Sequence, residues 1–275
     1  MLETLLGDHP VTLPWKRGDL GASAFPFRFA DVKVPNTAFK RVVRDLEFDV
    51  AELALVTFLL AKAHGKPLRL LPAVLTSRFQ HPLLIHDAQR GSYPLQDLEK
   101  KRVGLRSYSV TTAAWVRGIL ADDFGVDLSR VTWVTFEDPH VAEFRDPPNV
   151  QRAPLGSDIT SMLLAGELDA AIVGEAPKND RLQPLIPDPV GAAAAWRRRT
   201  GAVQINHMVV TKSSLSPAAR DEVFRLLSEG RKAAGNPEMS PFGLAENRRN
   251  LEAAIACVYR QGMIPRPFSV EELFA

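Results

Sequence analysis

The sequence predicts an α/β fold in which parallel sheets are covered by helices on both faces. Short apolar runs of strand length alternate with longer stretches of helical spacing along the whole chain. The 275 residues suit one large or two medium domains. Hydrophobic residues make up 45% of the chain and charged residues 24%, which is the balance of an ordinary globular protein.

Strands are expected at apolar runs bounded by turn residues, and helices where apolar residues recur at helical spacing and a glycine such as Gly65 or Gly125 follows. Ligands collect outside the carboxyl ends of parallel strands, so the loops after Leu105, around Gly156 and after Val50 are expected to hold a site. The expected strands are residues 11–13, 27–34, 47–52, 68–74, 81–86, 101–105, 131–136, 168–173 and 203–211. The expected helices are residues 38–45, 53–65, 112–124, 158–166, 192–199, 217–234, 244–261 and 270–274.

Composition argues against several classes of protein. The net charge is +2, from 34 basic and 32 acidic side chains, which does not suggest a nucleic-acid binder. The N-terminal stretch has no basic start followed by an apolar run, so a chain that begins here is expected in the cytoplasm. The longest apolar stretch, 53–63, is too short to cross a bilayer. Cys257 is the one cysteine, so no internal disulfide forms, and its apolar helical surroundings predict a core position.

A hydroxyl-rich loop precedes the helix expected at 112–124. Helix starts leave free N–H groups and a partial positive charge, which attract a carboxylate. The hydroxyls of this loop could instead cap the helix, since every helix needs a cap. The candidate anion-binding residues are Arg106, Ser107, Ser109, Thr111 and Thr112.

Two further arginines are candidates for binding a carboxylate. Arg117 lies on the same helix, either on its surface or facing a ligand with its planar, permanently charged fork. Ser77, Arg78 and His81 lie between two apolar runs. Because an unpaired buried charge is costly, a polar cluster at such a place is expected to bind a partner or a ligand. Arg78 could bind a substrate carboxylate, or could pair with Glu52 or Asp49 in a structural ion pair.

Candidates for proton chemistry are His81, His207 and Glu52. His81 could pass protons near neutral pH, and His207 lies in an apolar strand where a histidine is either a core residue or functional. Glu52 follows the short strand and could tune a histidine, bind a substrate hydroxyl, or sit at a helix start favoured by the dipole. The other histidines are interpreted as ordinary: His9, His64, His86 and His140.

Several cofactor signatures are missing from the sequence. No spacing of His, Cys and Glu typical of a metal site stands out, so no metal ligand is assigned. Glycine patterns of phosphate loops and nucleotide-binding turns are also absent, as is the Gly-x-Ser-x-Gly pattern of hydrolases. The sequence therefore predicts no cofactor, although it leaves a metal requirement open.

Several stretches in this order resemble the 4,5-dihydroxyphthalate decarboxylase family. The resemblance covers nearly the whole chain, most clearly from Asp49 onward, and is most specific around residues 112–118. The stretches are FDVAELAL at 48–55, SRFQH at 77–81, RVGLRSYSVTTAAWVRGILADDFGVD at 102–127, LLAGELDAAI at 163–172, RRTGAVQINHMVV at 198–210, PFGLAENRRNLEAAIACVYRQGM at 241–263, and the terminal EELFA.

The resemblance implies the fold of the type 2 periplasmic-binding proteins, in which two α/β lobes joined by two crossing strands close over a ligand. Lobe one would be residues 1–87 plus 208–275, and lobe two would be residues 88–207, with the ligand cleft between them. The chain departs from the family pattern at Gln80, where members tend to carry an arginine, and at 203–206, which commonly reads like Phe-Pro-Ile-Met. These departures allow a substrate other than 4,5-dihydroxyphthalate.

The resemblance also implies the non-oxidative decarboxylation of a hydroxylated aromatic acid, 4,5-dihydroxyphthalate or a close relative. In that reaction His81 or His207 would deliver the proton, and Glu52 would orient a histidine or a substrate hydroxyl. Arg78, Arg106 or Arg117 would hold the retained carboxylate together with Ser77 and the loop hydroxyls.

Two other functions stay open. The chain could be a solute-binding protein for a small organic anion, without catalysis, or an enzyme of the same fold with different chemistry, such as those of the menaquinone pathway. The expected partner is a small aromatic carboxylate, with neither nucleic acid nor membrane. A homo-oligomer is possible, since the amphipathic helices near the C-terminus could pack on their own lobe or on another subunit.

Overall fold

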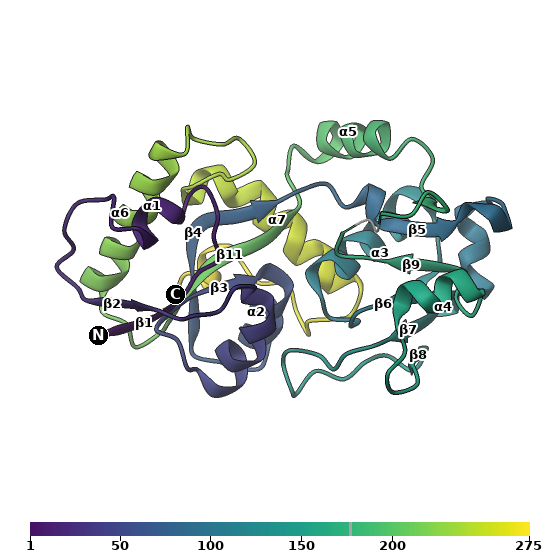
Figure 1. Ribbon diagram of the computed structural model, residues 1–275, viewed down its shortest axis with the longest axis horizontal. Helices are drawn as coiled ribbons and strands as arrows, with labels where there is room; N and C mark the ends of the chain where they lie inside the picture. The colour runs from purple at the N-terminus through teal and green to yellow at the C-terminus, as the bar shows by residue number, and fades with distance from the viewer. Residues whose placement is uncertain (176–177) are drawn as a thin grey trace. The chain divides into compact units, whose positions relative to one another are not determined.

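The computed structural model describes residues 1–175 and 178–275 (Figure 1). Within these residues the chain divides into two compact units. The first unit consists of Met1–Arg78 and Ala202–Ala275, and the second of Phe79–Gly201. Each unit contains its own sheet.

The boundaries expected from the sequence, 87/88 and 207/208, lie nine and six residues further along the chain than those of the structure, 78/79 and 201/202. Strand β5 (Leu84–Asp87) belongs to the second unit because it pairs with β9 and β10 of that sheet. Strand β11 (Ile205–Lys212) belongs to the first unit because it pairs with β3 and β4. The sequence predicted His81 in the same lobe as Glu52, but in the structure His81 belongs to the second unit.

The sheet of the first unit has the strand order β2-β1-β3-β11-β4 (Figure 1). Strand β1 pairs in parallel with β2 and β3, as expected for an α/β fold. Strand β11 is antiparallel to both of its neighbours, so the expectation of an all-parallel sheet is wrong here. The other bounds are β1 Leu2–Leu5, β2 Phe27–Phe29, β3 Val50–Ala54 and β4 Leu68–Ser77.

Helices bury the strands of this sheet. Strand residues such as Leu71 and Val209 share a core cluster with Trp15 of α1 and Leu226 of α6. Helix α2 contacts β3, β4, β11 and α7, and most of its side chains are buried. The bounds are α1 Leu13–Lys16, α2 Leu55–Ala63, α6 Pro217–Ala233 and α7 Leu244–Arg260.

The sheet of the second unit has the order β10-β5-β9-β6-β7-β8. Strands β9, β6, β7 and β8 are parallel neighbours, so their carboxyl ends share one edge of the sheet. Strand β5 is antiparallel to both of its neighbours, β10 and β9. The bounds are β6 Arg102–Leu105, β7 Thr132–Thr135, β8 Val150–Arg152, β9 Ala170–Ile172 and β10 Leu182–Pro184.

Helices α3 (Thr111–Phe124), α4 (Ile159–Ala165) and α5 (Pro189–Thr200) complete the second unit. Met162 and Leu163 of α4 share a core cluster with strand residues of this sheet. The expected end of α3 is confirmed, because Gly125 adopts the left-handed conformation with φ of 67° that glycine tolerates without strain.

Some elements differ from the sequence expectation, mostly where a proline intervenes. Residues 11–13 are not a strand, because α1 begins there with Pro14 in its first turn. Residues 81–83 form a 3₁₀ turn containing Pro82, so strand β5 begins only at Leu84. The single-turn and irregular helices are η1 Pro35–Ala38, η2 Arg41–Asp45, η3 His81–Leu83, η4 Ala88–Arg90, η5 Leu95–Lys100, η6 Leu128–Arg130 and η7 Glu271–Leu273.

Across the described residues, no helix combines the length and the apolar character needed to span a lipid bilayer.

Candidate active site

A buried carboxylate lies in the middle of the first sheet. Glu52 belongs to β3 and not to a helix start, which corrects the alternative drawn from the sequence, because α2 begins only at Leu55. Its side chain is 1% exposed. A carboxylate buried to this extent needs hydrogen-bond donors on both oxygens, because leaving it unpaired would cost several kcal/mol.

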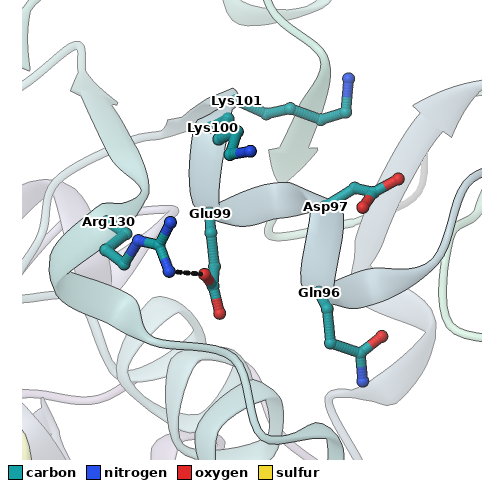
Figure 2. A pocket seen from close by; sticks show the side chains of 6 residues that line it. All are labelled: Gln96, Asp97, Glu99, Lys100, Lys101 and Arg130. Carbon is teal, nitrogen blue, oxygen red and sulfur yellow. Dashed lines mark ion pairs between the residues drawn. The ribbon is translucent and has the colours of Figure 1, made fainter.

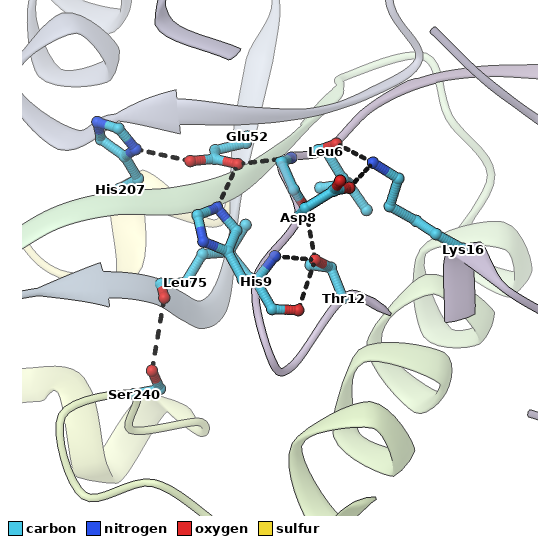
Figure 3. A network of polar contacts seen from close by, with 10 residues as sticks. Leu6, Asp8, His9, Thr12, Lys16, Glu52, Leu75, His207 and Ser240 are labelled. Carbon is cyan, nitrogen blue, oxygen red and sulfur yellow. Dashed lines mark hydrogen bonds and ion pairs between the residues drawn. The ribbon is translucent and has the colours of Figure 1, made fainter. Parts of the chain in front are cut away.

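Two histidines and one backbone amide supply those donors (Figure 3). His207, from the adjacent strand β11, places its Nδ1 atom 2.6 Å from Glu52 Oε1. His9, from the loop that follows β1, places its Nε2 atom 2.8 Å from Glu52 Oε2. The backbone N–H of Gly7 donates to the same Oε2 atom at 2.9 Å. Through these hydrogen bonds, Glu52 of β3 connects its strand to β11 and to residues 7–12, called the 7–12 loop below.

The charge on Glu52 fixes the protons on both rings. Burial raises the pKa of the Glu52 carboxyl, but hydrogen bonds from His207 and His9 outweigh it and hold the pKa well below its usual range. The carboxylate is therefore ionised near neutral pH and only accepts hydrogen bonds. It follows that His207 carries a proton on Nδ1 and His9 carries one on Nε2.

The opposite nitrogen of His207, Nε2, is not the one that contacts Glu52. The side chain is 24% exposed, and Nε2 has no hydrogen-bond partner among the described residues. Phe39 contacts the ring edge-to-face at a centroid distance of 5.2 Å. A carboxylate behind one ring nitrogen and an open second nitrogen suit a residue that donates or accepts a proton.

Sequence reasoning missed His9, because its loop has no periodic pattern and its partner Glu52 is 43 residues away. The 7–12 loop is held by its own hydrogen bonds (Figure 3). Thr12 Oγ1 donates to the carbonyl of Gly7 at 2.5 Å, and it accepts from the N–H of His9 at 3.0 Å. Lys16 donates to the carbonyl of Leu6 at 3.0 Å and pairs with Asp8. His9 lies in the loop directly after β1, and this position could have marked it as a candidate. Strand β1 itself, however, was not predicted from the sequence.

Position 7 must be a glycine, because its backbone lies close to the side chains of His9 and Glu52. A Cβ atom at this position would lie 2.8 Å from His9 Nε2 and 2.9 Å from Glu52 Oε2. We expect Gly7→Ala to destabilise the protein by about 1–3 kcal/mol, because the loop must move away from the carboxylate. Urea unfolding measures this change. Gly21→Ala is the matched control, since a Cβ atom there meets nothing within 4 Å. Equal stability of the two variants would contradict the packing described.

In the second unit, helix α3 begins one residue earlier than expected, at Thr111. Its N-cap residue is Val110, whose side chain makes no capping hydrogen bond. Ser107 and Ser109 are buried with their hydroxyl oxygens 3.3 Å apart, and Thr111 is buried beside them. Arg106 is partly exposed and lies 3.9 Å from Glu137.

A pocket of about 340 Å³ lies at the carboxyl ends of β6, β7 and β9. Arg106 supplies a cation to it, and Ser157 and Thr160 supply hydroxyls. This is the edge of the sheet where the sequence predicted a site. The lining residues are Arg106, Phe136, Ser157, Asp158, Ile159, Thr160, Ile172, Val173, Gly174 and Glu175.

Arg117 is neither on the surface nor at this pocket. Its side chain is fully buried, and its guanidinium lies 3.6 Å from the centroid of the Tyr108 ring and 5.7 Å from that of Trp133. Burial raises the pKa of the nearby Asp146 carboxyl, and the positive charge of Arg117 opposes this effect. The surroundings of Arg117 are those of a cation stacked in a core.

His81 is completely buried, and neither ring nitrogen has a hydrogen-bond partner among the described residues. Its turn packs against α3 and α5. Burial, with a smaller contribution from the charge of Arg199, lowers the pKa of the His81 imidazole to about 4. The ring is therefore neutral near pH 7, and a neutral imidazole is a far weaker acid than the protonated form.

Ser77 and Arg78 end β4. The Ser77 hydroxyl donates to the carbonyl of Met239, and Arg78 is exposed. Asp49 pairs with Lys212 at 2.9 Å, and both Glu52 oxygens are taken by the bonds described above. The structural ion pair considered for Arg78 is therefore not formed within the part of the chain described.

A second pocket of about 490 Å³ lies near the amino ends of β6 and β7 (Figure 2). Charged side chains line it, and Glu99 pairs with Arg130 at 2.7 Å. Lys101 pairs with Asp169 at 3.2 Å. No three His, Cys, Asp or Glu side chains of residues 1–175 and 178–275 are grouped so that they could hold a metal ion.

Comparison with known proteins decides the family. The chain is 33% identical over 177 residues to a 4,5-dihydroxyphthalate decarboxylase of Pseudomonas putida, covering 60% of this chain and 69% of that protein. The chain belongs to the 4,5-dihydroxyphthalate decarboxylase family. A protein of the same name from Comamonas testosteroni is 29% identical over 284 residues, covering 87% of this chain and 86% of the relative. No family model matches the chain.

Solved structures show the fold of this family member. The alkanesulfonate-binding protein SsuA of Xanthomonas axonopodis pv. citri superposes with a TM-score of 0.55 over 99% of this chain and 96% of its own, at 14% identity. The chain thus has the type 2 periplasmic-binding-protein-like fold, as the family resemblance implied. At this identity the likeness concerns the fold alone.

Proposed function

We propose that the protein removes one carboxyl group as carbon dioxide from a hydroxylated phthalate-type acid, 4,5-dihydroxyphthalate or a close relative. The observation that carries the proposal is the family relationship to proteins named 4,5-dihydroxyphthalate decarboxylase. The His9–Glu52–His207 arrangement supports it, because decarboxylation of an aromatic acid needs a proton donor for the ring carbon.

The reaction balances without an external oxidant. A ring hydroxyl pushes electron density into the ring, and the carbon that bears the leaving carboxylate takes a proton from the enzyme. The bond to the carboxylate then breaks, its electron pair restores the aromatic ring, and carbon dioxide leaves. The donor takes up a new proton from solvent before the next turnover.

We assign proton delivery to Nε2 of His207. Its Nδ1–H is held by the Glu52 carboxylate, which orients the ring. His81 is the less suitable donor, because it is buried and neutral. Glu52 acts through His207 as its orienting partner.

Within the second unit, we assign anion binding to Arg106 and to the hydroxyl groups that line the same pocket. Arg117 is less suited, since its guanidinium is packed on Tyr108 in a core. Ser77, Arg78 and the loop hydroxyls of Ser107, Ser109, Thr111 and Thr112 stay candidates for substrate contacts. We propose no metal ion or organic cofactor.

The test is incubation with a panel of hydroxylated benzene carboxylates, with carbon dioxide and the aromatic product measured. We expect carbon dioxide release from 4,5-dihydroxyphthalate or a closely related diacid, unchanged by excess chelator. Thermal shift on the same panel measures binding. Thermal stabilisation without turnover across the panel would contradict the proposal and favour a solute-binding protein, the function that its structural neighbour SsuA bears in its name.

A further inference from the structure

His9 shares the Glu52 carboxylate with the proposed proton donor, but on the other oxygen. Oε2 accepts from Nε2 of His9 at 2.8 Å and from the N–H of Gly7 at 2.9 Å. Oε1 accepts only from His207 among the described residues, at 2.6 Å. The arrangement is asymmetric: two donors hold Oε2, whereas Oε1 is held by the His207 ring alone (Figure 3).

The torsion that turns a glutamate carboxylate is soft and roughly two-fold, so the backbone alone does not fix it. Gly7 provides one donor to Oε2, and His207 contacts Oε1. The second bond to Oε2, from His9, restricts rotation of the carboxylate further and so helps to set its plane. The direction in which Oε1 meets His207 therefore depends on His9.

The 7–12 loop is built to present His9 in one place. The N–H of His9 donates to Thr12 Oγ1 at 3.0 Å, and the same hydroxyl donates back to the carbonyl of Gly7. Lys16 holds the carbonyl of Leu6 at the start of the loop. The His9 side chain is 20% exposed, whereas the Glu52 side chain that it contacts is 1% exposed.

We propose that His9 is a positioning residue for the proton transfer assigned to His207. By fixing Oε2 of Glu52, it directs Oε1 at Nδ1 of His207 and so aims Nε2 of that ring. The three side chains then act as one His–Glu–His unit. They come from the 7–12 loop, from β3 and from β11. This inference rests on the proposed function, because it names the part that His9 takes in the same reaction.

The geometry distinguishes between replacements at position 9. Glutamine carries its amide nitrogen near the position of imidazole Nε2, which is the atom that contacts Glu52. Asparagine carries its amide near the position of Nδ1, too short to reach Oε2. We expect His9→Gln to keep kcat within about threefold, and His9→Asn and His9→Ala to lower it about tenfold to a hundredfold, with KM unchanged. His64→Gln, at an exposed histidine, is the control.

A readout without turnover separates this inference from the proposed function. Imidazole N–H protons bonded to a buried carboxylate give proton NMR signals downfield of the amide region. We expect two such signals in the wild type, one from His9 and one from His207. His9→Ala should remove one and shift the other, whereas His9→Gln should leave the His207 signal in place.

The outcomes are distinct. Equal kcat in the Gln, Asn and Ala variants, or an unmoved His207 signal in folded His9→Ala, overturns the positioning role. Absence of turnover in the wild type overturns the proposed decarboxylation instead, and the NMR comparison then still tests how His9 holds Glu52.

Discussion

Glu52→Gln is expected to lower kcat by about a hundredfold to ten-thousandfold, the range over which positioned acid–base groups contribute. The buried carboxylate accepts a hydrogen bond from Nδ1 of His207 and so orients its ring. An amide has the same shape but no charge, and its NH₂ group in place of Oε1 would meet the N–H of His207 as a second donor. Steady-state kinetics with the accepted substrate measures the change.

The matched control for this variant is Glu252→Gln, because Glu252 is exposed and lies 4.0 Å from Arg248 in a helix-surface pair. Combining Glu52→Gln with His207→Gln should cost little more than the His207 change alone, since the carboxylate acts through that ring. Full additivity of the two losses, or a Glu52→Gln variant as active as the control, would contradict the assignment of Glu52.

The alternation of apolar runs and helical stretches was enough to predict two-sided α/β packing. It failed at strands with little apolar content, such as Leu2–Leu5, whose four residues include Glu3 and Thr4. It also could not give strand direction, since an antiparallel strand such as β11 has the same apolar pattern as a parallel one. Direction depends on tertiary pairing, which a local pattern does not contain.

The candidate site was predictable in part. Glu52 and His207 each interrupt an apolar run, and a polar side chain in such a run must find a buried partner. That they pair with each other depends on the register of β3 against β11, in which Ala54 faces His207. His9 lay outside any periodic segment, so only the fold brings it to Glu52.

His81 is a candidate for the same chemistry, and its surroundings also predict an effect on stability. Its imidazole is completely buried without a hydrogen-bond partner among the described residues, and burial lowers its pKa to about 4 from 6.5. Between these values the unfolded chain binds a proton that the folded chain does not. Stability therefore rises with pH through this window and is independent of this group above it.

We expect His81→Leu to stabilise the protein, and to do so more at low pH. Leucine fills a similar volume and removes the two unpaired nitrogens, each of which costs free energy in a core. At about pH 5 the variant also escapes the proton uptake of the unfolded chain, so its gain over wild type should be larger there than at about pH 8 by about 2 kcal/mol. Urea unfolding of both proteins at the two pH values measures the difference.

The comparison is a difference between two proteins at two pH values, so the titration of all other groups cancels where the fold is unchanged. His64→Leu controls for the loss of an imidazole from the surface, since His64 is exposed where α2 ends. A gain from His81→Leu that is the same at both pH values would mean that the ring is reached by water or by a hydrogen-bond partner in solution. A destabilised variant at about pH 8 would mean that its nitrogens are bonded there, and His81 would return as a candidate for substrate contact.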